Sequence, residues 1–323
     1  MSDLLISAVP PRTSRALDHP STIVSDATLT RTVPREFVHR AAVAEVLLTG
    51  WERVDGVLFR MSAQWPRGHS FFSALPTGHH DPMLAAETIR QAGTLLAHAE
   101  FGVPLGSRFM MSELHFTVVP EHSLVGAAPA DLDLEVSCTE VRPRGRSIAG
   151  MRVDVAIRRE GALVAHGGGQ LGCISPTAYD RLRGEHRTPG PVAAVTPVPA
   201  GSVGRRSGFD VVLGATDQPH RWRLRAETSH PVLFDHPVDH APGMLLLEAA
   251  RQATHVFTPC QGSIPVSITS SFQRYVELDR PCWIEAGPVV AKGGGRTTVT
   301  ILGRQDGRPV FSCVVETLPV RTG

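Results

Sequence analysis

The chain has 323 residues, of which 42% are hydrophobic and 20% charged, and its formal net charge is +1. This length exceeds what one hydrophobic core usually supports, so two domains are expected. The near-neutral charge gives no reason to expect a nucleic-acid partner or attraction to an anionic membrane. Of the 32 lysine and arginine residues only Lys292 is a lysine, which argues against Schiff-base chemistry and leaves arginine to bind any anionic substrate.

The five cysteines are widely spaced, odd in number and form no Cys-x-x-Cys pair. A disulfide framework or a structural zinc site is therefore not expected, and a reducing cytoplasm fits the pattern. The N-terminus lacks a basic start followed by a long apolar run, and no stretch approaches the roughly 18 apolar residues of a membrane span. We expect a cytoplasmic protein without a membrane segment.

Two segments are rich in proline and lack sustained periodicity. Residues 1–22 are expected to form a flexible tail, and residues 184–203 to form a linker. They leave a first unit at residues 23–183 and a second unit at residues 204–323.

The two units resemble each other. Residues 69–105 align without gaps to residues 230–266 at a constant offset of 161, and ten of these 37 positions are identical. Seven of the ten identities fall within residues 79–92. An internal duplication is the simplest explanation.

In each unit the sequence predicts one helix followed by an antiparallel set of strands. A proline at or near the first turn begins each helix, and alternating or apolar runs separated by glycine turns mark the strands. A sheet wrapped around one apolar helix is the hotdog arrangement, so we expect an α+β double hotdog. Its two helices would pack side by side as an intramolecular pseudo-dimer, with the substrates bound between the copies. The helices are expected at residues 82–101 and 242–257, and the strands at 107–118, 132–141, 148–158, 163–174, 264–276, 282–291, 297–304 and 309–317.

The stretch from residue 234 to 252 is the richest in polar groups that could carry chemistry. It resembles the hotdog β-hydroxyacyl-carrier-protein dehydratases, in which His, Pro-Gly, Glu and Gln occupy similar places. Pro242-Gly243, Glu248 and Gln252 keep that spacing. His236 is two residues too close to Pro242, and Arg251 replaces a small residue.

Those departures and the duplication indicate another hotdog family. Over about residues 34–320 the chain resembles the A-factor biosynthesis (γ-butyrolactone autoregulator) synthases of actinobacteria, chiefly through the tandem Glu-x-x-Arg-Gln motifs at residues 87–91 and 248–252. The resemblance implies transfer of a β-ketoacyl group from acyl carrier protein or coenzyme A to dihydroxyacetone phosphate. The product would be a 2-oxo-3-(phosphooxy)propyl 3-oxoalkanoate, an early intermediate of a signalling lactone.

Acyl transfer to an alcohol needs a base for the hydroxyl and donors for the developing oxyanion. Glu248 or Glu87, on largely apolar helices, is a candidate base whose pKa desolvation would raise toward the working pH. By analogy with the dehydratases, His236 is a further catalytic candidate. Gly243 would let the thioester approach the free amides at the start of its helix.

The acceptor is a small dianion, and guanidinium groups bind phosphate bidentately. Arg251 and Arg90 are therefore the candidate phosphate ligands, and Gln252 is a further substrate-binding candidate. An internal ion pair that fixes the interface between the copies is the structural alternative for each Glu/Arg pair.

No metal or cofactor is expected. His236 and His240 could be metal ligands, but Pro237 and Pro242 break the helix that such a pair needs, and no third ligand has diagnostic spacing. Residues 167–172 match GxGxxG without the helix and acidic residue that a dinucleotide fold requires.

Two rival functions stay open. One is a dehydratase or hydratase on β-hydroxyacyl thioesters, and the other is a non-catalytic regulator that holds a lipid-like ligand between the copies. Further assembly into a homo-oligomer also stays open.

Overall fold

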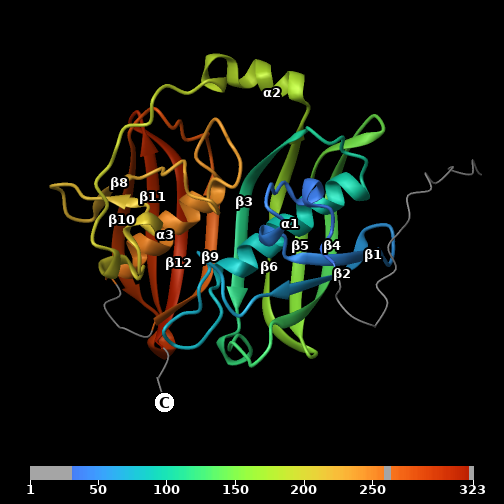
Figure 1. Ribbon diagram of the computed structural model, residues 1–323, viewed down its shortest axis with the longest axis horizontal. Helices are drawn as coiled ribbons and strands as arrows, with labels where there is room; N and C mark the ends of the chain where they lie inside the picture. Colours follow the sequence, from blue (N-terminus) through green and yellow to red (C-terminus); the bar gives the residue numbers. More distant parts are fainter. Residues whose placement is uncertain (1–30, 258–262, 320–323) are drawn as a thin grey trace, which may run out of the picture.

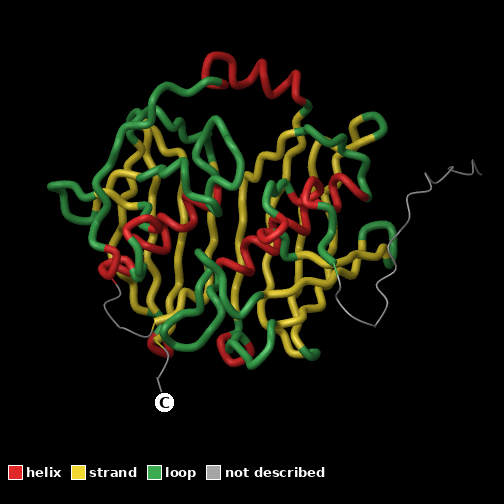
Figure 2. Tube along the Cα trace, in the orientation of Figure 1, coloured by secondary structure: helices red, strands yellow, loops and turns green. Residues whose placement is uncertain are grey.

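The computed structural model describes residues 31–257 and 263–319. The tail expected at residues 1–22 lies outside the described residues. One continuous antiparallel sheet of twelve strands forms the body of the molecule, and the two long helices cross in front of it (Figures 1 and 2).

The first repeat begins with a short 3-10 helix and ends with a helix that leads to the second repeat. Its elements are η1 (Arg35–Val38), η2 (Val43–Glu45), β1 (Leu48–Arg53), β2 (Leu58–Trp65), α1 (Met83–Ala99), β3 (Arg108–Val118), η3 (Pro120–His122), β4 (Ala130–Arg144), β5 (Ser147–Arg159), β6 (Ala162–Ile174), α2 (Pro176–Arg183) and η4 (Gly184–Arg187).

The second repeat has the same order of strands around its long helix, without an equivalent of α2. They are η5 (Ala200–Val203), η6 (Gly208–Asp210), β7 (Leu213–Gly214), β8 (Arg221–Leu224), α3 (Gly243–Phe257), β9 (Ser263–Phe272), β10 (Cys282–Ala291), η7 (Gly293–Gly295), β11 (Thr297–Gln305) and β12 (Arg308–Pro319). Both predicted helices and all eight predicted strands are confirmed, with bounds that agree to within four residues. Strands β1, β2, β7 and β8 and helix α2 were not predicted.

The strand order shows that the repeats are joined as a pseudo-dimer. It runs β1-β2-β4-β5-β6-β3-β9-β12-β11-β10-β8-β7, so that reading inward from each end meets equivalent strands in turn. At the centre, β3 pairs with β9 from Glu113 opposite Ser271 to Thr117 opposite Ser267. This strand pair, rather than the expected packing of helix on helix, carries the junction.

Helix α1 is buried on nearly every side because the sheet of the first repeat curves around it. Small and aliphatic residues such as Ala86, Leu95 and Leu96 fill this position and are fully buried. Helix α3 has the same environment in the second repeat. A charged side chain on either helix must therefore find its partners inside the protein.

The equivalence of the repeats extends into the segment expected to be a linker. Residues 199–205 form η5 and its caps with the same pattern as residues 34–40 around η1. Val38 and Val203, at equivalent places, are both fully buried. The segment before η5 carries the chain from α2, which spans the two halves at the top of Figure 1.

Candidate active site

The first predicted glutamate, Glu87, lies at the centre of a cluster of cations and amides. Arg90 Nε donates to Oε2 over 2.9 Å, and Arg40 Nε donates to Oε1 over 3.0 Å. Gln91 Nε2 adds a hydrogen bond of 2.7 Å to Oε1. The carboxylate is 1% exposed.

The second predicted glutamate, Glu248, has an equivalent cluster. Arg251 Nε donates to Oε2 over 2.8 Å, Arg205 Nε to Oε1 over 2.9 Å, and Gln252 Nε2 to Oε1 over 2.5 Å. Gln252 also donates to the Asp210 carbonyl and accepts from the Val212 amide. Its polar atoms are thus all used inside the protein, and its side chain is fully buried.

The expected rise in the pKa of these glutamates is wrong. Burial alone would raise the pKa, but the two arginines beside each carboxylate outweigh it and lower the pKa of both Glu87 and Glu248 to about 2. Both carboxylates are therefore ionised, and several donors already occupy their oxygens. Such a group is a poor acceptor for a substrate proton.

Both clusters also cross between the repeats. Arg40 Nη1 donates to the carbonyl of Val232 over 3.0 Å, and Arg205 Nη1 donates to the carbonyl of Phe71 over 2.6 Å. Phe71 and Val232 are equivalent residues, 161 positions apart. The paired clusters therefore fasten each half to the other, as the structural alternative proposed.

A cavity of about 1470 Å³ lies between the repeats. Of the predicted site residues, Arg90, His236 and Gly243 line it. The others, Glu87, Glu248, Arg251 and Gln252, are not among its lining residues. The predicted site residues thus fall into two sets. Three of them line the cavity, and the other four belong to the clusters that hold the repeats together.

The starts of the two long helices differ, although they are equivalent in the duplication. In the first repeat, Asp81 Oδ1 accepts a hydrogen bond of 2.9 Å from the Met83 amide and so caps α1. In the second repeat, Pro242 occupies the equivalent position. Among the described residues, no protein group accepts a hydrogen bond from the amides of Gly243 or Met244. These two residues line the cavity, so the start of α3 is open to a ligand.

His236 lies in the loop before α3 beside a carboxylate that can orient it. Its Nδ1 is 3.3 Å from Asp235 Oδ2, and its side chain is 38% exposed. The amides of Ala41 and Ala42, from the first repeat, donate to Asp235. Burial would raise the pKa of Asp235, but these amides and His236 lower it. An ionised Asp235 holds a proton on Nδ1 and leaves Nε2 available to a ligand.

The cavity is strongly basic. Nine arginines line it against four carboxylates, so it favours anionic ligands. Arg108, Arg142 and Arg274 have no carboxylate partner among the described residues. Sequence reasoning missed them because no motif distinguishes them from the many other arginines of the chain.

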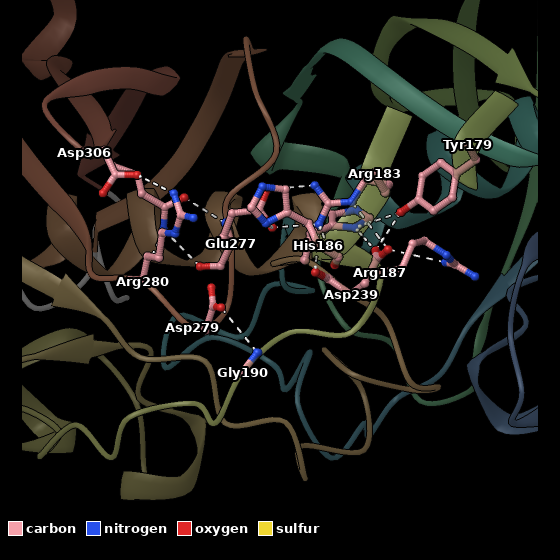
Figure 3. Close-up of polar contacts among 12 residues, drawn as sticks. Tyr179, Arg183, His186, Arg187, Gly190, Asp239, Glu277, Asp279, Arg280 and Asp306 are labelled. Carbon is pink, nitrogen blue, oxygen red and sulfur yellow. Dashed lines mark hydrogen bonds and ion pairs between the residues drawn. The ribbon is translucent and has the colours of Figure 1, made fainter. Parts of the chain in front are cut away.

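A polar network fixes α2 over one side of the cavity (Figure 3). Tyr179 donates to Asp239 Oδ1 over 2.6 Å, and Arg183 Nη2 donates to Glu277 Oε2 over 2.7 Å. Burial would raise the pKa of Asp239, but its hydrogen bonds to His240 and Tyr179 lower it. Tyr179 and Arg183 belong to a helix that was not predicted, so the sequence carried no signal for this network.

Two further properties concern cations and membranes. Over residues 31–257 and 263–319, no group of three His, Cys, Asp or Glu side chains is placed to hold a metal ion. Within the same part of the chain, no helix is both long and apolar enough to cross a membrane.

The sequence has close relatives that are named as synthases. It is 52% identical over 290 residues to a 2-oxo-3-(phosphooxy)propyl 3-oxoalkanoate synthase of Streptomyces virginiae, covering 90% of this chain and 98% of the relative. A synthase of the same name from Streptomyces coelicolor is 43% identical, over 86% of this chain and 89% of the relative. Another from Streptomyces griseus is 40% identical, over 94% and 98%.

Solved structures with the same fold include two thioesterases. An acyl-ACP thioesterase from Bacteroides thetaiotaomicron superposes with a TM-score of 0.51 at 11% identity, over 80% of this chain and 97% of that one. A putative oleoyl thioesterase from Lactobacillus plantarum gives a TM-score of 0.50 at 11% identity, over 83% and 98%. The family model of the A-factor biosynthesis hotdog domain matches residues 21–175 and again residues 186–321. The chain therefore belongs to the A-factor biosynthesis hotdog family.

Proposed function

We propose that this protein transfers a β-ketoacyl group from a thioester to the hydroxyl of dihydroxyacetone phosphate, forming a 2-oxo-3-(phosphooxy)propyl 3-oxoalkanoate. The observation that carries the proposal is the cavity between the repeats, which brings together Arg90, His236 and the open start of α3 at Gly243. These three supply an anion-binding group, an oriented imidazole and free amide donors. The names of the family relatives support the same reaction.

The thioester carbonyl is proposed to bind at the start of α3. The amides of Gly243 and Met244 are unused by the protein and lie at the positive end of the helix dipole. Negative charge develops on the carbonyl oxygen as the alcohol attacks, so donors placed there stabilise the transition state more than the ground state.

The phosphate of the acceptor is proposed to bind Arg90 rather than Arg251. Arg90 Nε and Nη2 are held by Glu87 and the Val38 carbonyl, while Nη1 donates to no described protein atom. The hydrogen bonds of Nε and Nη2 fix the guanidinium. Its free Nη1 is proposed to bind the phosphate in the cavity that Arg90 lines. Arg108, also on the cavity wall and without an acidic partner, is the second cation of this phosphate site.

His236 is proposed to carry proton-transfer chemistry, with Asp235 as its orienting carboxylate. Glu87 and Glu248 are not proposed as bases, because arginines and amides saturate both. Their proposed role is to hold Arg40, Arg90, Arg205 and Arg251 in place.

The acyl chain is proposed to lie along the apolar part of the wall, which includes Leu114, Leu171, Leu247 and Phe272. The volume is larger than a triose phosphate needs and leaves space for the pantetheine arm of the donor. The donor is β-ketoacyl-ACP or β-ketoacyl-CoA, and no cofactor is required for this chemistry. A cytoplasmic location is part of the proposal, and the four free cysteines that the structure describes are in keeping with it.

The dehydratase alternative fits the geometry less well. That chemistry, as expected from the sequence, would pair His236 with a glutamate from the other repeat. Glu87 belongs to the other repeat, but it is buried, bound by two arginines and absent from the cavity wall.

The test incubates the purified protein with a β-ketoacyl thioester and dihydroxyacetone phosphate and identifies the products by mass. A phosphorylated keto-ester together with free thiol is the expected result. Unphosphorylated dihydroxyacetone serves as the matched acceptor, and a β-hydroxyacyl thioester tests dehydration. Formation of an enoyl thioester without any keto-ester would overturn the proposal.

A further inference from the structure

His39 occupies a backbone conformation that histidine rarely adopts. Its φ is 53° and its ψ 51°, in the left-handed region, where it caps the C-terminus of η1. The equivalent residue of the second repeat, after η5, is Gly204, with φ 70° and ψ 23°. Glycine adopts this conformation without strain. The second repeat thus shows that the turn itself needs no side chain here, so the imidazole of His39 calls for another explanation.

A chain of hydrogen bonds determines which nitrogen of His39 carries the proton. His98 Nδ1 lies 2.7 Å from the carbonyl oxygen of Val103, which can only accept, so this nitrogen carries a hydrogen. His98 Nε2 lies 2.8 Å from His39 Nε2. In a neutral His98 that Nε2 is an acceptor, so the hydrogen between the rings belongs to His39 Nε2. His39 Nδ1 then bears a lone pair.

His39 lies among the groups of the proposed site. His39 lines the same cavity as Arg90, Arg108 and His236. Its ring packs edge-on against Phe109 at 4.9 Å and lies almost parallel to that of His98 at 5.1 Å. Among the described residues, no protein donor reaches Nδ1.

We infer that His39 is the general base that takes the proton of the acceptor hydroxyl, and that His236 protonates the departing thiolate. The inference rests on the proposed function, which requires a base for the alcohol and favours an acid for the sulfur. Two histidines on opposite sides of the junction between repeats divide these tasks.

Protons and electron pairs are conserved in this transfer. The hydroxyl proton moves to His39 Nδ1 while the oxygen forms a bond to the thioester carbon. The tetrahedral intermediate then re-forms its C=O bond and breaks the C–S bond, and the sulfur takes a proton from His236. Proton transfer from His39 back to His236, directly or through water, restores both rings. No oxidant or further reactant is consumed.

The charges around His39 make this base dependent on the acceptor. Burial, then His98, Arg90, His236 and Arg108, lower the pKa of His39 to about 3. Without a bound anion the ring is a weak base, and water in the cavity is poorly activated. A phosphate dianion on Arg90 and Arg108 offsets their charge and raises the pKa of His39. Binding of the phosphorylated alcohol thereby makes His39 a stronger base. This favours acyl transfer to the alcohol over hydrolysis of the thioester.

The test replaces His39 with the residue that the second repeat carries at the same place. His39→Gly relieves the backbone and leaves room for a free imidazole molecule, whereas His39→Asn tolerates the left-handed conformation and fills part of that space. The control is His255→Gln, because His255 lies against Gly204 in the second repeat and does not line the cavity. Thiol release from the donor is followed with and without acceptor and with added imidazole.

We expect His39→Gly to lower kcat about 100-fold or more, in the range of general-base catalysis, with a much smaller change in KM for the acceptor. Free imidazole should restore a substantial part of the rate, and substituted imidazoles of higher pKa should restore more. His39→Asn should be equally slow and should not be rescued. His255→Gln should turn over as the unmodified protein does.

Two results would overturn the inference. One is turnover by His39→Gly within threefold of the unmodified protein. The other is a loss that imidazole does not restore in a variant whose melting temperature is unchanged. A failure of the proposed function looks different, because the unmodified protein would then release no thiol with dihydroxyacetone phosphate. If another alcohol supports thiol release, the same variants are compared with that acceptor.

Discussion

Arg205 and Glu248 form an ion pair at 2.9 Å within the second repeat, and the same guanidinium reaches the Phe71 carbonyl of the first repeat. Arg40 and Glu87 make the reciprocal arrangement. The Glu-x-x-Arg-Gln motif of each repeat thus holds an arginine that donates a hydrogen bond to the backbone of the other repeat.

Glu248→Gln is expected to lower the free energy of unfolding by about 3–5 kcal/mol, the range for breaking a buried ion pair. The reason is that Arg205 and Arg251 would be left buried without a countercharge. Urea denaturation measures the effect, with the exposed Glu36→Gln as control. A variant as stable as the unmodified protein but inactive would restore Glu248 as a candidate base.

Stability should fall in acid because of the same carboxylates. The pKa of Glu87 and Glu248 is about 2 in the folded protein and 4.5 as an ordinary side chain, so the unfolded chain binds protons first as the pH falls. Their stabilising contribution is full above pH 4.5 and is lost progressively toward pH 2. Melting temperatures recorded across this range should decline, and less steeply in Glu248→Gln. An equal decline in that variant would contradict the assignment.

Arg90→Ala is expected to lower kcat/KM for dihydroxyacetone phosphate. The loss of transition-state stabilisation should be about 2–5 kcal/mol, as for removal of one partner from a buried charge pair. The loss should be much smaller with unphosphorylated dihydroxyacetone. Arg90→Lys should recover only part, since an ammonium group lacks the planar fork. Arg251→Ala is the matched comparison, because Arg251 does not line the cavity. It should reduce stability without changing the preference for the phosphorylated acceptor; the opposite pattern would return Arg251 to the phosphate site.

The role of the free amide at the start of α3 can be tested by removing the amide hydrogen of Gly243. Pro82 is the residue of the first repeat equivalent to Gly243, so Gly243→Pro should be tolerated by the fold while it removes one amide hydrogen. Loss of an oxyanion donor typically costs about 10²–10³ in kcat. Gly243→Ala keeps the amide, and its Cβ would meet the Phe272 ring at an ordinary 3.4 Å. Equal kcat values for the two variants would exclude the amide from the reaction.

His236→Gln should lower kcat about 10²–10⁴-fold, the usual contribution of a positioned acid or base. Asp235→Asn should have a smaller effect on kcat, because it removes the orienting charge and leaves the imidazole. A donor with a more acidic thiol separates the two, since its sulfur needs less help from an acid and the loss in His236→Gln should become smaller. Turnover by His236→Gln within threefold of the unmodified protein would remove this residue from the chemistry.

Much of the architecture could be predicted from local pattern. The ten identities at an offset of 161 indicate the duplication, and the apolar helices and alternating strands are patterns of residues close in the chain. These elements are present as predicted. Strands β7 and β8, with two and four residues, are too short to carry a periodic signal. Their place in the sheet depends on the pairing of β8 with β10 and of β7 with β8, which only the folded chain provides.

The sequence by itself determined that two glutamates and two arginines recur at fixed spacing on buried helices. The tertiary structure alone decided what they do. The second arginine of each cluster, Arg40 or Arg205, is more than 40 residues from its glutamate along the chain. This arginine helps to lower the pKa of the glutamate, which burial alone would raise. The pKa of a buried acid depends on the charges that folding brings within a few ångströms. The choice between Arg90 and Arg251 likewise required the cavity, because its wall includes Arg90 but not Arg251.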